Sequence, residues 1–274
     1  YGASQTFQWQ ASATLAGTYT NVGNPKLTPD TTIISTTSLY YRCEIKCGGA
    51  TVYSTPILLT VNPALPTGSY TINKALPTNW PTTTVGANFN SFNDAKASMN
   101  CGILGAVTFN VVANSGPYTE QLILDSIKGT SVVNTITFNG LGNTIAFSST
   151  NTNERAVIKL KSADHIRFDS LIIDATGPNG FGYGVQLINN ADSNIIRKCS
   201  ILANTTLTTA NYAGIVINST DAGPVTLGNT WCDGNKFDRN TISGGFYGVT
   251  LVGSATQLIE GNQFTNNTIK DFYT

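Results

Sequence analysis

The chain has few charged residues and few of the side chains that commonly hold metals. Charged residues make up 11% of its 274 residues, the formal net charge is zero, and the single histidine is His165. A nucleic-acid-binding protein needs a basic stripe, so this balance argues against a nucleic-acid partner. One histidine without a C-x-x-C pair also argues against a zinc site.

Long apolar runs are missing too. No stretch of 18 apolar residues occurs, which argues against a membrane-spanning helix. Five cysteines are too few for a dense disulfide framework: Cys43, Cys47, Cys101, Cys199 and Cys232. The chain starts with Tyr1 and shows no signal peptide, so we expect a piece of a longer protein. Its many Thr, Asn, Ser and Gly residues favour a secreted, β-rich surface protein.

A segment near the C-terminal end repeats almost unchanged. Residues 234–242 read GNKFDRNTI and residues 261–269 read GNQFTNNTI, an offset of 27 residues. Self-similarity at a fixed period of about 20 to 50 residues predicts repeats that bury their apolar side chains against each other.

The repeat extends toward the N-terminus as three columns of apolar residues. The first has spacings of 27, 41, 28 and 28 residues and consists of Ile269, Ile242, Ile201, Ile173 and Ile145. Five residues earlier stand Phe264, Phe237, Ile196, Phe168 and Gly140, so Gly140 interrupts the second column. The third consists of Leu251, Ile217, Leu187 and Leu160 on short alternating runs. We expect strands of about three to five residues.

Short strands, Gly and Asn turns and this period predict a parallel β-helix. A helical solenoid is the alternative, but Gly177-Pro178 ends the one helical pattern of the region. Asn143, Asn240 and Asn267 recur at one position, where inward amides can form a structural ladder along the axis.

Residues 1–64 follow a different pattern. Residues 41–47 alternate between apolar and charged side chains, which predicts a half-buried strand, and Trp9 lies on an earlier strand. An early Trp and a later Tyr-x-Cys are typical of an immunoglobulin-like sandwich. These residues and Ser54-Thr55-Pro56 resemble the immunoglobulin-like modules of large secreted Bacteroidota proteins. Because such modules begin with two further strands, the resemblance implies that the N-terminal strands are missing, together with the partner of Cys47.

The second domain is expected over residues 65–274, after a short stiff linker. Ser91 and Asp94 have capping-box spacing, and a helix there would put Phe92, Ala95 and Met99 on one side, with Phe89 just before. We expect this helix to cover the open end of the coils.

Residues 105–111 and 117–122 resemble the opening of pectin-lyase-like right-handed β-helices from the same bacteria, and the resemblance covers residues 69–274. The fold class predicted is therefore all-β: a partial immunoglobulin-like sandwich, then a right-handed parallel β-helix with an N-terminal capping helix, truncated at its C-terminal end. The resemblance also implies export by the type IX secretion machinery and an extracellular or outer-membrane surface-attached location.

Catalytic signatures are missing from the sequence. The hydrolase motifs Asn-Thr-Asp, Asp-Asp and Gly-His-Gly do not occur. Asp169 and Arg197 stand 28 residues apart, which predicts an ion pair between adjacent coils, with a lyase centre as the alternative. Asp164 and Asp192 share this offset and are expected to bond turn amides. Calcium between them is the one cofactor that the sequence suggests.

The spacing of 41 residues between Ile201 and Ile242 predicts an inserted loop, residues 219–234. Aromatic rings beside carboxylates suit sugar binding, and the candidate ligand-binding residues are Trp231, Tyr183, Tyr212, Tyr247, Asp221 and Asp233. A tyrosine ladder that only supports the coils is the alternative. We expect Trp231 to be at least partly exposed, because the loop has few apolar neighbours.

Three segments resemble the O-glycosylation acceptor of Bacteroidota, which is Asp followed by Ser or Thr and then an apolar residue or Thr. They give Thr31, Ser126 and Ser170 as candidate glycosylation sites.

Together these features predict a fragment of a large extracellular adhesin or scaffold at the cell surface, with a polysaccharide or cell-surface glycan as its partner. The alternatives are a polysaccharide lyase or glycoside hydrolase with catalytic coils beyond Thr274, and an extracellular filament subunit.

Overall fold

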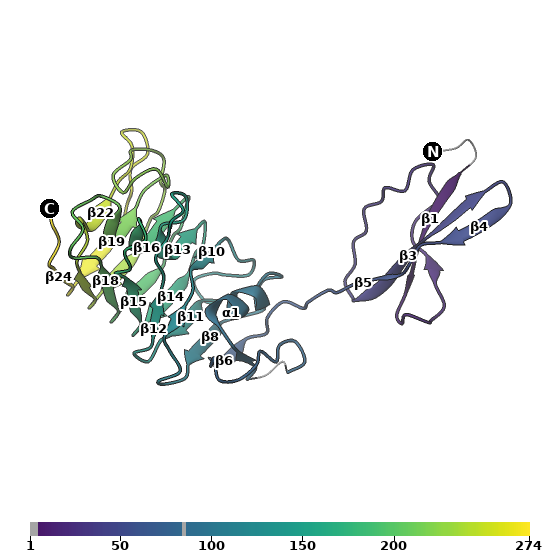
Figure 1. Cartoon of the computed structure of the whole chain (residues 1–274), viewed down its shortest axis with the longest axis horizontal. Coiled ribbons are helices and arrows are strands. Elements are labelled where there is room, and N and C mark those ends of the chain that lie inside the picture. Colours follow the sequence, from purple (N-terminus) through teal and green to yellow (C-terminus); the bar gives the residue numbers. More distant parts are fainter. Residues whose placement is uncertain (1–4, 84–85) are drawn as a thin grey trace. The chain divides into compact units, whose positions relative to one another are not determined.

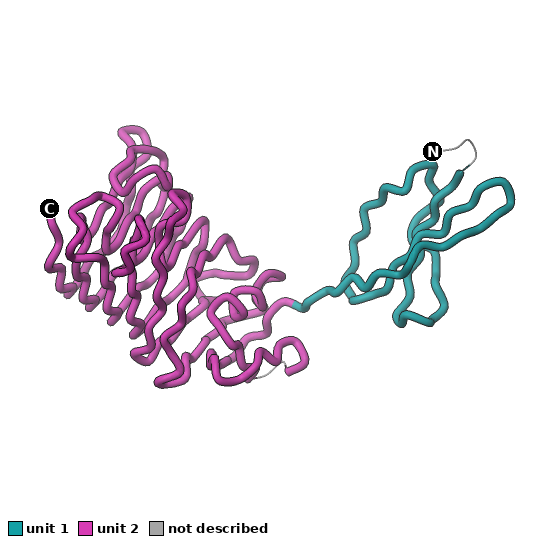
Figure 2. The backbone as a smooth tube through the Cα atoms, viewed as in Figure 1, with its two compact units in different colours: residues 1–63 teal, residues 64–274 magenta. Residues whose placement is uncertain are grey.

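The structure, a computed structural model, describes residues 5–83 and 86–274. The chain divides into two compact units, residues 1–63 and residues 64–274, coloured separately in Figure 2. This division lies next to the predicted boundary between Ala64 and Leu65.

The described part of the first unit is one antiparallel sheet in the order β2-β1-β3-β4, with β5 also paired to β3. Its strands are β1 (Thr6–Ser12), β2 (Thr20–Asn21), β3 (Leu39–Cys47), β4 (Ala50–Tyr53) and β5 (Ile57–Leu59). Trp9 pairs with Cys43, so both side chains lie on one face of the sheet. The indole N–H of Trp9 donates to the carbonyl of Pro29 at 2.8 Å, so the segment between β2 and β3 covers part of that face. Cys47 is exposed, and the cysteines are free thiols.

The second unit contains three sheets whose strands pair in parallel (Figure 1). Sheet 1 is made of β6 (Gly68–Ile72), β7 (Asn88–Phe89), β8 (Val107–Val111), β11 (Ile136–Asn139), β14 (Ile166–Asp169), β17 (Ile195–Arg197), β20 (Lys236–Asp238) and β23 (Gln263–Thr265). Sheet 2 is made of β9 (Tyr118–Thr119), β12 (Thr144–Ala146), β15 (Ile172–Ala175), β18 (Ser200–Ala203), β21 (Thr241–Ser243) and β24 (Thr268–Lys270). Sheet 3 is made of β10 (Leu122–Leu124), β13 (Ala156–Lys161), β16 (Gly182–Ile188), β19 (Tyr212–Ile217) and β22 (Tyr247–Leu251).

From β8 onward the chain visits sheets 1, 2 and 3 in turn, so each coil adds one strand to each sheet. The described residues are thus nearly all-β, with parallel sheets of the kind that a β-helix or a similar fold contains. The strands of sheet 3 from β13 to β19 are longer than the sequence predicted, because both of their faces are covered.

The apolar columns read from the sequence lie in register, and their residues are buried inside the coils except at the C-terminal end, where Leu251 and Ile269 are exposed and Phe264 is half-buried. In sheet 2 the paired residues are Ile145, Ile173, Ile201, Ile242 and Ile269, and in sheet 3 they are Leu160, Leu187, Ile217 and Leu251. The column predicted to break at Gly140 is continuous, because Phe138 takes that position and pairs with Phe168. Their rings stack with centroids 5.2 Å apart. The turn after β11 is longer than its counterparts, and this shifts the spacing.

The amide ladder predicted along the axis is present between Asn240 and Asn267, whose side chains bond at 3.1 Å. Each side chain also bonds a backbone N–H and a carbonyl of the preceding coil. A second ladder of the same kind, absent from the sequence prediction, joins Asn194, Asn235 and Asn262. These amides, of which Asn194, Asn235 and Asn240 are buried, satisfy turn backbone groups that would otherwise lack partners.

Helix α1 (Phe92–Ser98) begins as its capping spacing predicts. The Ser91 hydroxyl accepts the N–H of Asp94 at 3.0 Å. The carboxylate of Glu120 accepts the N–H groups of Phe92 and Asn93, both at 2.9 Å. In the described part of the chain no helix is long and apolar enough to cross a membrane.

The buried side of α1 packs onto the first coils. The ring of Phe92 lies 5.2 Å from that of Tyr118 and 5.9 Å from that of Phe138. Ala95 and Met99 are buried with it. Phe89 joins the same core from β7. The helix therefore covers the coils as expected.

Candidate functional site

The first half of the inserted loop lies over the outer face of sheet 3. The hydroxyl of Thr250 donates to the carbonyl of Pro224 at 3.0 Å, and the Asn218 amide donates to the carbonyl of Gly223 at 2.6 Å. The Gln186 amide in turn donates to the Asn218 side chain at 3.0 Å. Outward side chains of sheet 3 therefore hold the backbone of this loop.

An ion pair fastens the loop at its tip. Nζ of Lys159 lies 2.8 Å from Oδ1 and 2.9 Å from Oδ2 of Asp221, and it also donates to the carbonyl of Asn153 at 3.1 Å. Lys159 is only 5% exposed. Lys159 is the one charged residue in the apolar run 156–160. This charge within a buried strand was the sequence feature that could have indicated a buried ion pair.

Arg155 stands beside this pair. Its guanidinium donates to the carbonyl of Thr152 at 2.9 Å, to the hydroxyl of Tyr183 at 3.0 Å and to the carbonyl of Ala222 at 3.2 Å. The same group lies 4.4 Å from the ring centroid of Phe181. Arg155 thus connects β13 to both β16 and the inserted loop, a role that sequence reasoning missed.

Under the loop edge lies a polar cavity of about 590 Å³, here called the loop pocket. It is lined by Thr152, Asn153, Arg155, Lys159, Lys161, Ile188, Asn189, Ser219, Thr220, Asp221 and Ala222. Asp221, predicted from the sequence as a ligand contact, is the one candidate ligand-binding residue among them.

The three candidate tyrosines do not form an exposed edge. Tyr183 and Tyr212 are buried and Tyr247 is half-buried. The Tyr212 hydroxyl accepts a hydrogen bond from the N–H of Gly180 at 3.1 Å. The Tyr183 hydroxyl accepts one from the guanidinium of Arg155. Burial raises the pKa of Tyr183 despite the neighbouring Arg155. In this structure the rings of Tyr183 and Tyr212 offer no face to a sugar, which favours the supporting role.

Trp231 is 40% exposed, in keeping with the prediction. Its backbone is in the left-handed region, at φ 46°. Just before it, the carbonyl of Thr230 accepts the N–H of Asn190 at 3.0 Å, and just after it Cys232 is buried in the core. The indole therefore projects from a fixed turn, and it lies outside the lining of the loop pocket.

Asp233 belongs to a ladder of carboxylates. The side chains of Asp164, Asp192 and Asp233 accept the backbone N–H groups of Asp192, Asp233 and Glu260, at 2.8, 2.7 and 2.7 Å. The sequence predicted turn amides as partners of Asp164 and Asp192, and these amides belong to the next coil. Burial raises the pKa of Asp192, and the charges of Asp164 and Asp233 add to this rise.

The sequence suggested calcium between these aspartates, but the described residues do not form a set of ligands for it. Within residues 5–83 and 86–274, no group of three or more His, Cys, Asp or Glu side chains is arranged to hold a metal ion.

Asp169 and Arg197 form the predicted ion pair between coils. Burial alone would raise the pKa of Asp169, but hydrogen bonds from Ser170 and Arg197 outweigh it and hold that pKa below its usual value. Both residues lie outside the lining of the loop pocket.

Burial raises the pKa of the Cys199 and Cys232 thiols to about 12, so both stay protonated near neutral pH.

The candidate glycosylation residues differ in exposure. Ser126 is exposed, Thr31 is half-buried, and Ser170 is half-buried with its hydroxyl donating to the carboxylate of Asp169. Modification of Ser170 would require that hydrogen bond to break.

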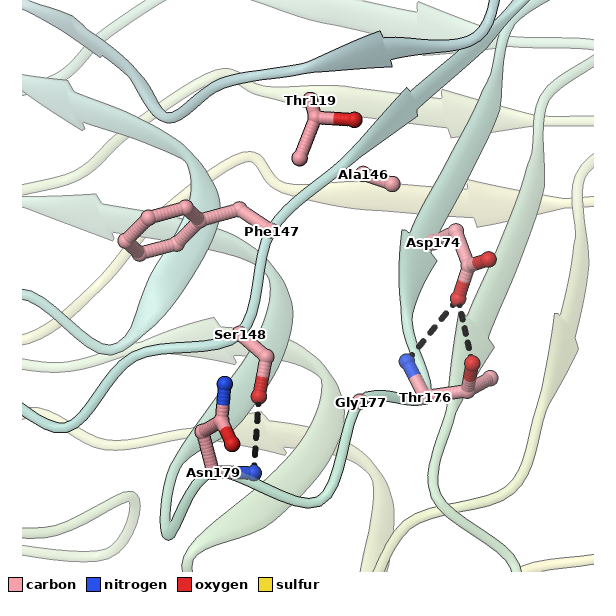
Figure 3. Close-up of a pocket in the computed structure, with 8 residues that line it drawn as sticks. All are labelled: Thr119, Ala146, Phe147, Ser148, Asp174, Thr176, Gly177 and Asn179. Atoms are coloured by element: carbon pink, nitrogen blue, oxygen red, sulfur yellow. Dashed lines mark hydrogen bonds between the residues drawn. The ribbon is translucent and has the colours of Figure 1, made fainter.

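A second cavity, here called the sheet pocket, lies on the outer face of sheet 2 and has a volume of about 410 Å³ (Figure 3). It is lined by Thr119, Ala146, Phe147, Ser148, Asp174, Thr176, Gly177 and Asn179. Thr119, Ala146 and Asp174 occupy paired positions on β9, β12 and β15, so they form a row across three coils. Sequence reasoning missed this pocket, because its members look like ordinary turn and strand residues.

Two hydrogen-bonded pairs shape the sheet pocket. Oδ1 of Asp174 accepts the N–H of Thr176 at 2.9 Å and its hydroxyl at 2.7 Å. Opposite, the hydroxyl of Ser148 accepts the N–H of Asn179 at 3.0 Å. Figure 3 shows Asp174 and Thr176 on one side, Ser148 and Asn179 on the other, and the ring of Phe147 pointing away from Asp174. Oδ2 of Asp174 and the Asn179 amide have no partner among the described residues.

Comparison with known proteins identifies no relative of this chain. None of the protein-family models, curated proteins or solved structures matched it. A function is therefore proposed from the geometry of the structure, above all from the loop pocket and the sheet pocket.

Proposed function

We propose that this chain is the ligand-presenting part of an extracellular, surface-attached adhesin or scaffold, and that its ligand is a carbohydrate. In this proposal the second unit is a right-handed parallel β-helix, and the first unit is an immunoglobulin-like module. Support comes from the strands that successive coils add to three parallel sheets, and from Trp9 beside Cys43 in the first unit. Type IX export and a Bacteroidota origin are expectations from the resemblance.

The sheet pocket is the observation that carries the carbohydrate proposal. Three hydroxyl side chains, one carboxylate and one amide line the pocket, and the small side chain of Ala146 leaves space between them. Sugars present several hydroxyl groups beside apolar C–H faces, so a mixed lining of this kind suits them. A volume of about 410 Å³ also falls in the range of about 300 to 1,000 Å³ that small-molecule sites occupy.

The pocket supports binding better than catalysis. Glycoside hydrolysis uses two carboxylates that face the same bond. Among the described residues that line the sheet pocket, Asp174 is the one ionisable side chain. Asp169 and Arg197 are paired with each other elsewhere. A lyase or hydrolase thus stays the alternative, and turnover of pectin or alginate that Asp169→Ala abolishes would favour it.

Filling the pocket tests the proposal. In Ala146→Phe a ring would occupy the floor between Thr119 and Asp174, so we expect glycan binding to be lost. The measurement is a glycan array with the whole chain, followed by calorimetric titration of the best sugar. Asp174→Asn removes the charge but keeps the shape, and should weaken binding about tenfold, as expected for a hydrogen bond to a charged group.

Ser243→Phe is the matched control. Ser243 occupies the same outward row of sheet 2, on β21, and lies outside the pocket lining. Its hydroxyl donates to the carboxylate of Asp271 at 3.0 Å, so the replacement should lower the thermal midpoint slightly and leave binding close to that of the parent. The proposal fails if the parent binds no glycan, or if Ala146→Phe and Ser243→Phe bind equally well.

A further inference from the structure

Cationic side chains converge on the loop pocket. Its lining includes Arg155, Lys159 and Lys161, and Asp221 is the one carboxylate among the described lining residues. Lys159 and Asp221 neutralise each other through their short ion pair. The remaining charge therefore comes from Arg155 and Lys161, two cations at one cavity in a chain whose net charge is zero.

Arg155 is a buried charge without a counter-charge. It is 7% exposed, and no carboxylate of the described residues pairs with it. Its three hydrogen bonds go to neutral oxygens, and the ring of Phe181 covers one side. Burying a charge is costly unless it is paired. A guanidinium with spare N–H groups at a polar cavity is therefore suited to bind an anion.

The other lining groups indicate which anion fits. Hydroxyls of Thr152, Ser219 and Thr220 and amides of Asn153 and Asn189 line the cavity and bring hydrogen-bond donors to it from three separate segments of the chain. A tetrahedral oxyanion accepts hydrogen bonds in three dimensions, whereas a carboxylate accepts them in one plane. The cavity of about 590 Å³ is far larger than a bare oxyanion, so it has room for an organic group attached to the anion.

We propose that the loop pocket binds a tetrahedral oxyanion ester of a sugar, a sulfate or a phosphate, with Arg155 and Lys161 as its cationic contacts. The sugar part lies toward the exposed residues Thr152, Asn153 and Asn189 at the rim. This site is separate from the sheet pocket and does not depend on it.

Calorimetric titration of the whole chain tests the inference. The probes are glucose 6-sulfate, glucose 6-phosphate, glucose, glucuronate, inorganic sulfate and inorganic phosphate. At least one sugar ester should bind about tenfold or more tightly than glucose and glucuronate, and its affinity should fall with added salt. The comparison of the two esters identifies the source of the oxyanion. The free ions show whether the sugar contributes.

Lys161→Ala is the first variant, because Lys161 is exposed and its loss should not disturb folding. We expect ester binding to weaken about tenfold. The matched control is Lys236→Ala, an exposed lysine on β20 outside this pocket, which should bind as the parent does. Arg155→Lys keeps the charge but loses the planar array of N–H donors of the guanidinium, and it should weaken ester binding more than Lys161→Ala does.

Asp221→Asn separates a ligand site from a structural ion-pair network. Without the carboxylate, Lys159 is free to join the ligand, so ester affinity should rise even though the thermal midpoint falls. A purely structural pair predicts the lower midpoint with no gain in affinity.

Besides an Asp221→Asn variant that gains no affinity, three results would overturn the inference. The first is ester binding no tighter than glucose binding, or matched by inorganic ions alone. The second is glucuronate binding as tightly as the esters, because the tetrahedral preference would then be wrong. The third is an equal effect of Lys161→Ala and Lys236→Ala. Ala146→Phe should leave ester binding unchanged, which keeps failure of this site distinct from failure of the sheet pocket.

Discussion

Phe237 is a buried member of the column of sheet 1, paired with Ile196 on one side and with Phe264, the last residue of the column, on the other. Its ring stacks on that of Phe264, with centroids 4.5 Å apart and an interplanar angle of 9°. Because strand register holds the neighbours in place, they cannot close the gap that a smaller side chain would leave. Phe237→Ala should therefore lower the free energy of unfolding by roughly 3 to 5 kcal/mol, measured by urea denaturation.

Phe272→Ala provides the comparison for this prediction. Phe272 is 45% exposed, so the same truncation should cost much less there. Similar losses for both variants would mean that Phe237 does not carry the packing inferred for it.

At the residue scale the sequence predicted which side chains repeat, but not every partner. The isoleucine and leucine columns follow directly from periodicity, because a buried position must recur once per coil. Phe138 was missed because two extra turn residues displaced it from the fixed offset. The Asn194 ladder was missed because Ile166 stands at that position in the coil before it.

At the element scale, the Lys159–Asp221 pair determines how the inserted loop lies on sheet 3. The Lys159 side chain is almost fully buried, whereas Asp221 retains some contact with solvent. Asp221→Ala leaves a buried ammonium without its counter-charge. It should lower the free energy of unfolding by about 3 kcal/mol, the low end for a broken buried pair.

A double-mutant cycle with Lys159→Met isolates this interaction. The double variant should recover most of the loss, because Met fills the same space without a charge. The control is the pair of Asp169 and Arg197, where the Arg197 side chain is 47% exposed, so Asp169→Ala leaves a solvated guanidinium and should cost about 1 kcal/mol or less. Equal costs at the two pairs would show that Lys159 is not held in a dry environment.

The sequence predicted the position and length of the inserted loop, but not its course. Asp221 lies 62 residues from Lys159, so no local pattern links them. Arg155 links Tyr183 to this loop, whereas Tyr212 is held by the N–H of Gly180. Glycines allow the strands of sheet 3 to pack closely against side chains of sheet 2. A Cβ at Gly184 would lie 2.3 Å from the Ile201 side chain, and one at Gly214 would lie 2.4 Å from the Ile242 side chain. Such contacts depend on sheet spacing, which periodicity does not give.

At the scale of the whole molecule, ladders of polar side chains run along the coils and link each coil to the next. The carboxylates of Asp164, Asp192 and Asp233 form one ladder, each bound to an amide one coil on. In repeat architectures such contacts are the nearest-neighbour terms on which cooperative unfolding depends. Stacked negative charges oppose the stabilising hydrogen bonds, so the strength of this ladder varies with pH.

Asp192 is where that dependence should be measurable. Burial first, and then the charges of Asp164 and Asp233, raise its pKa in the folded protein, against the opposing effects of the Asp233 N–H and His165. A carboxyl whose pKa is higher in the folded state contributes stability below its ordinary pKa of about 4. This contribution is lost as pH rises through the folded-state pKa.

Asp192→Asn removes the charge but keeps an oxygen that accepts the Asp233 N–H. The thermal midpoint of this variant should therefore exceed that of the parent at about pH 7, and the two should converge near pH 3, where Asp192 is protonated in both states. The control is Asp125→Asn, at an exposed position outside the ladder. The difference between its thermal midpoint and that of the parent should not change in this way with pH. A constant difference from pH 3 to pH 7, or a lower midpoint at neutral pH, would mean that repulsion between coils is not what Asp192 contributes.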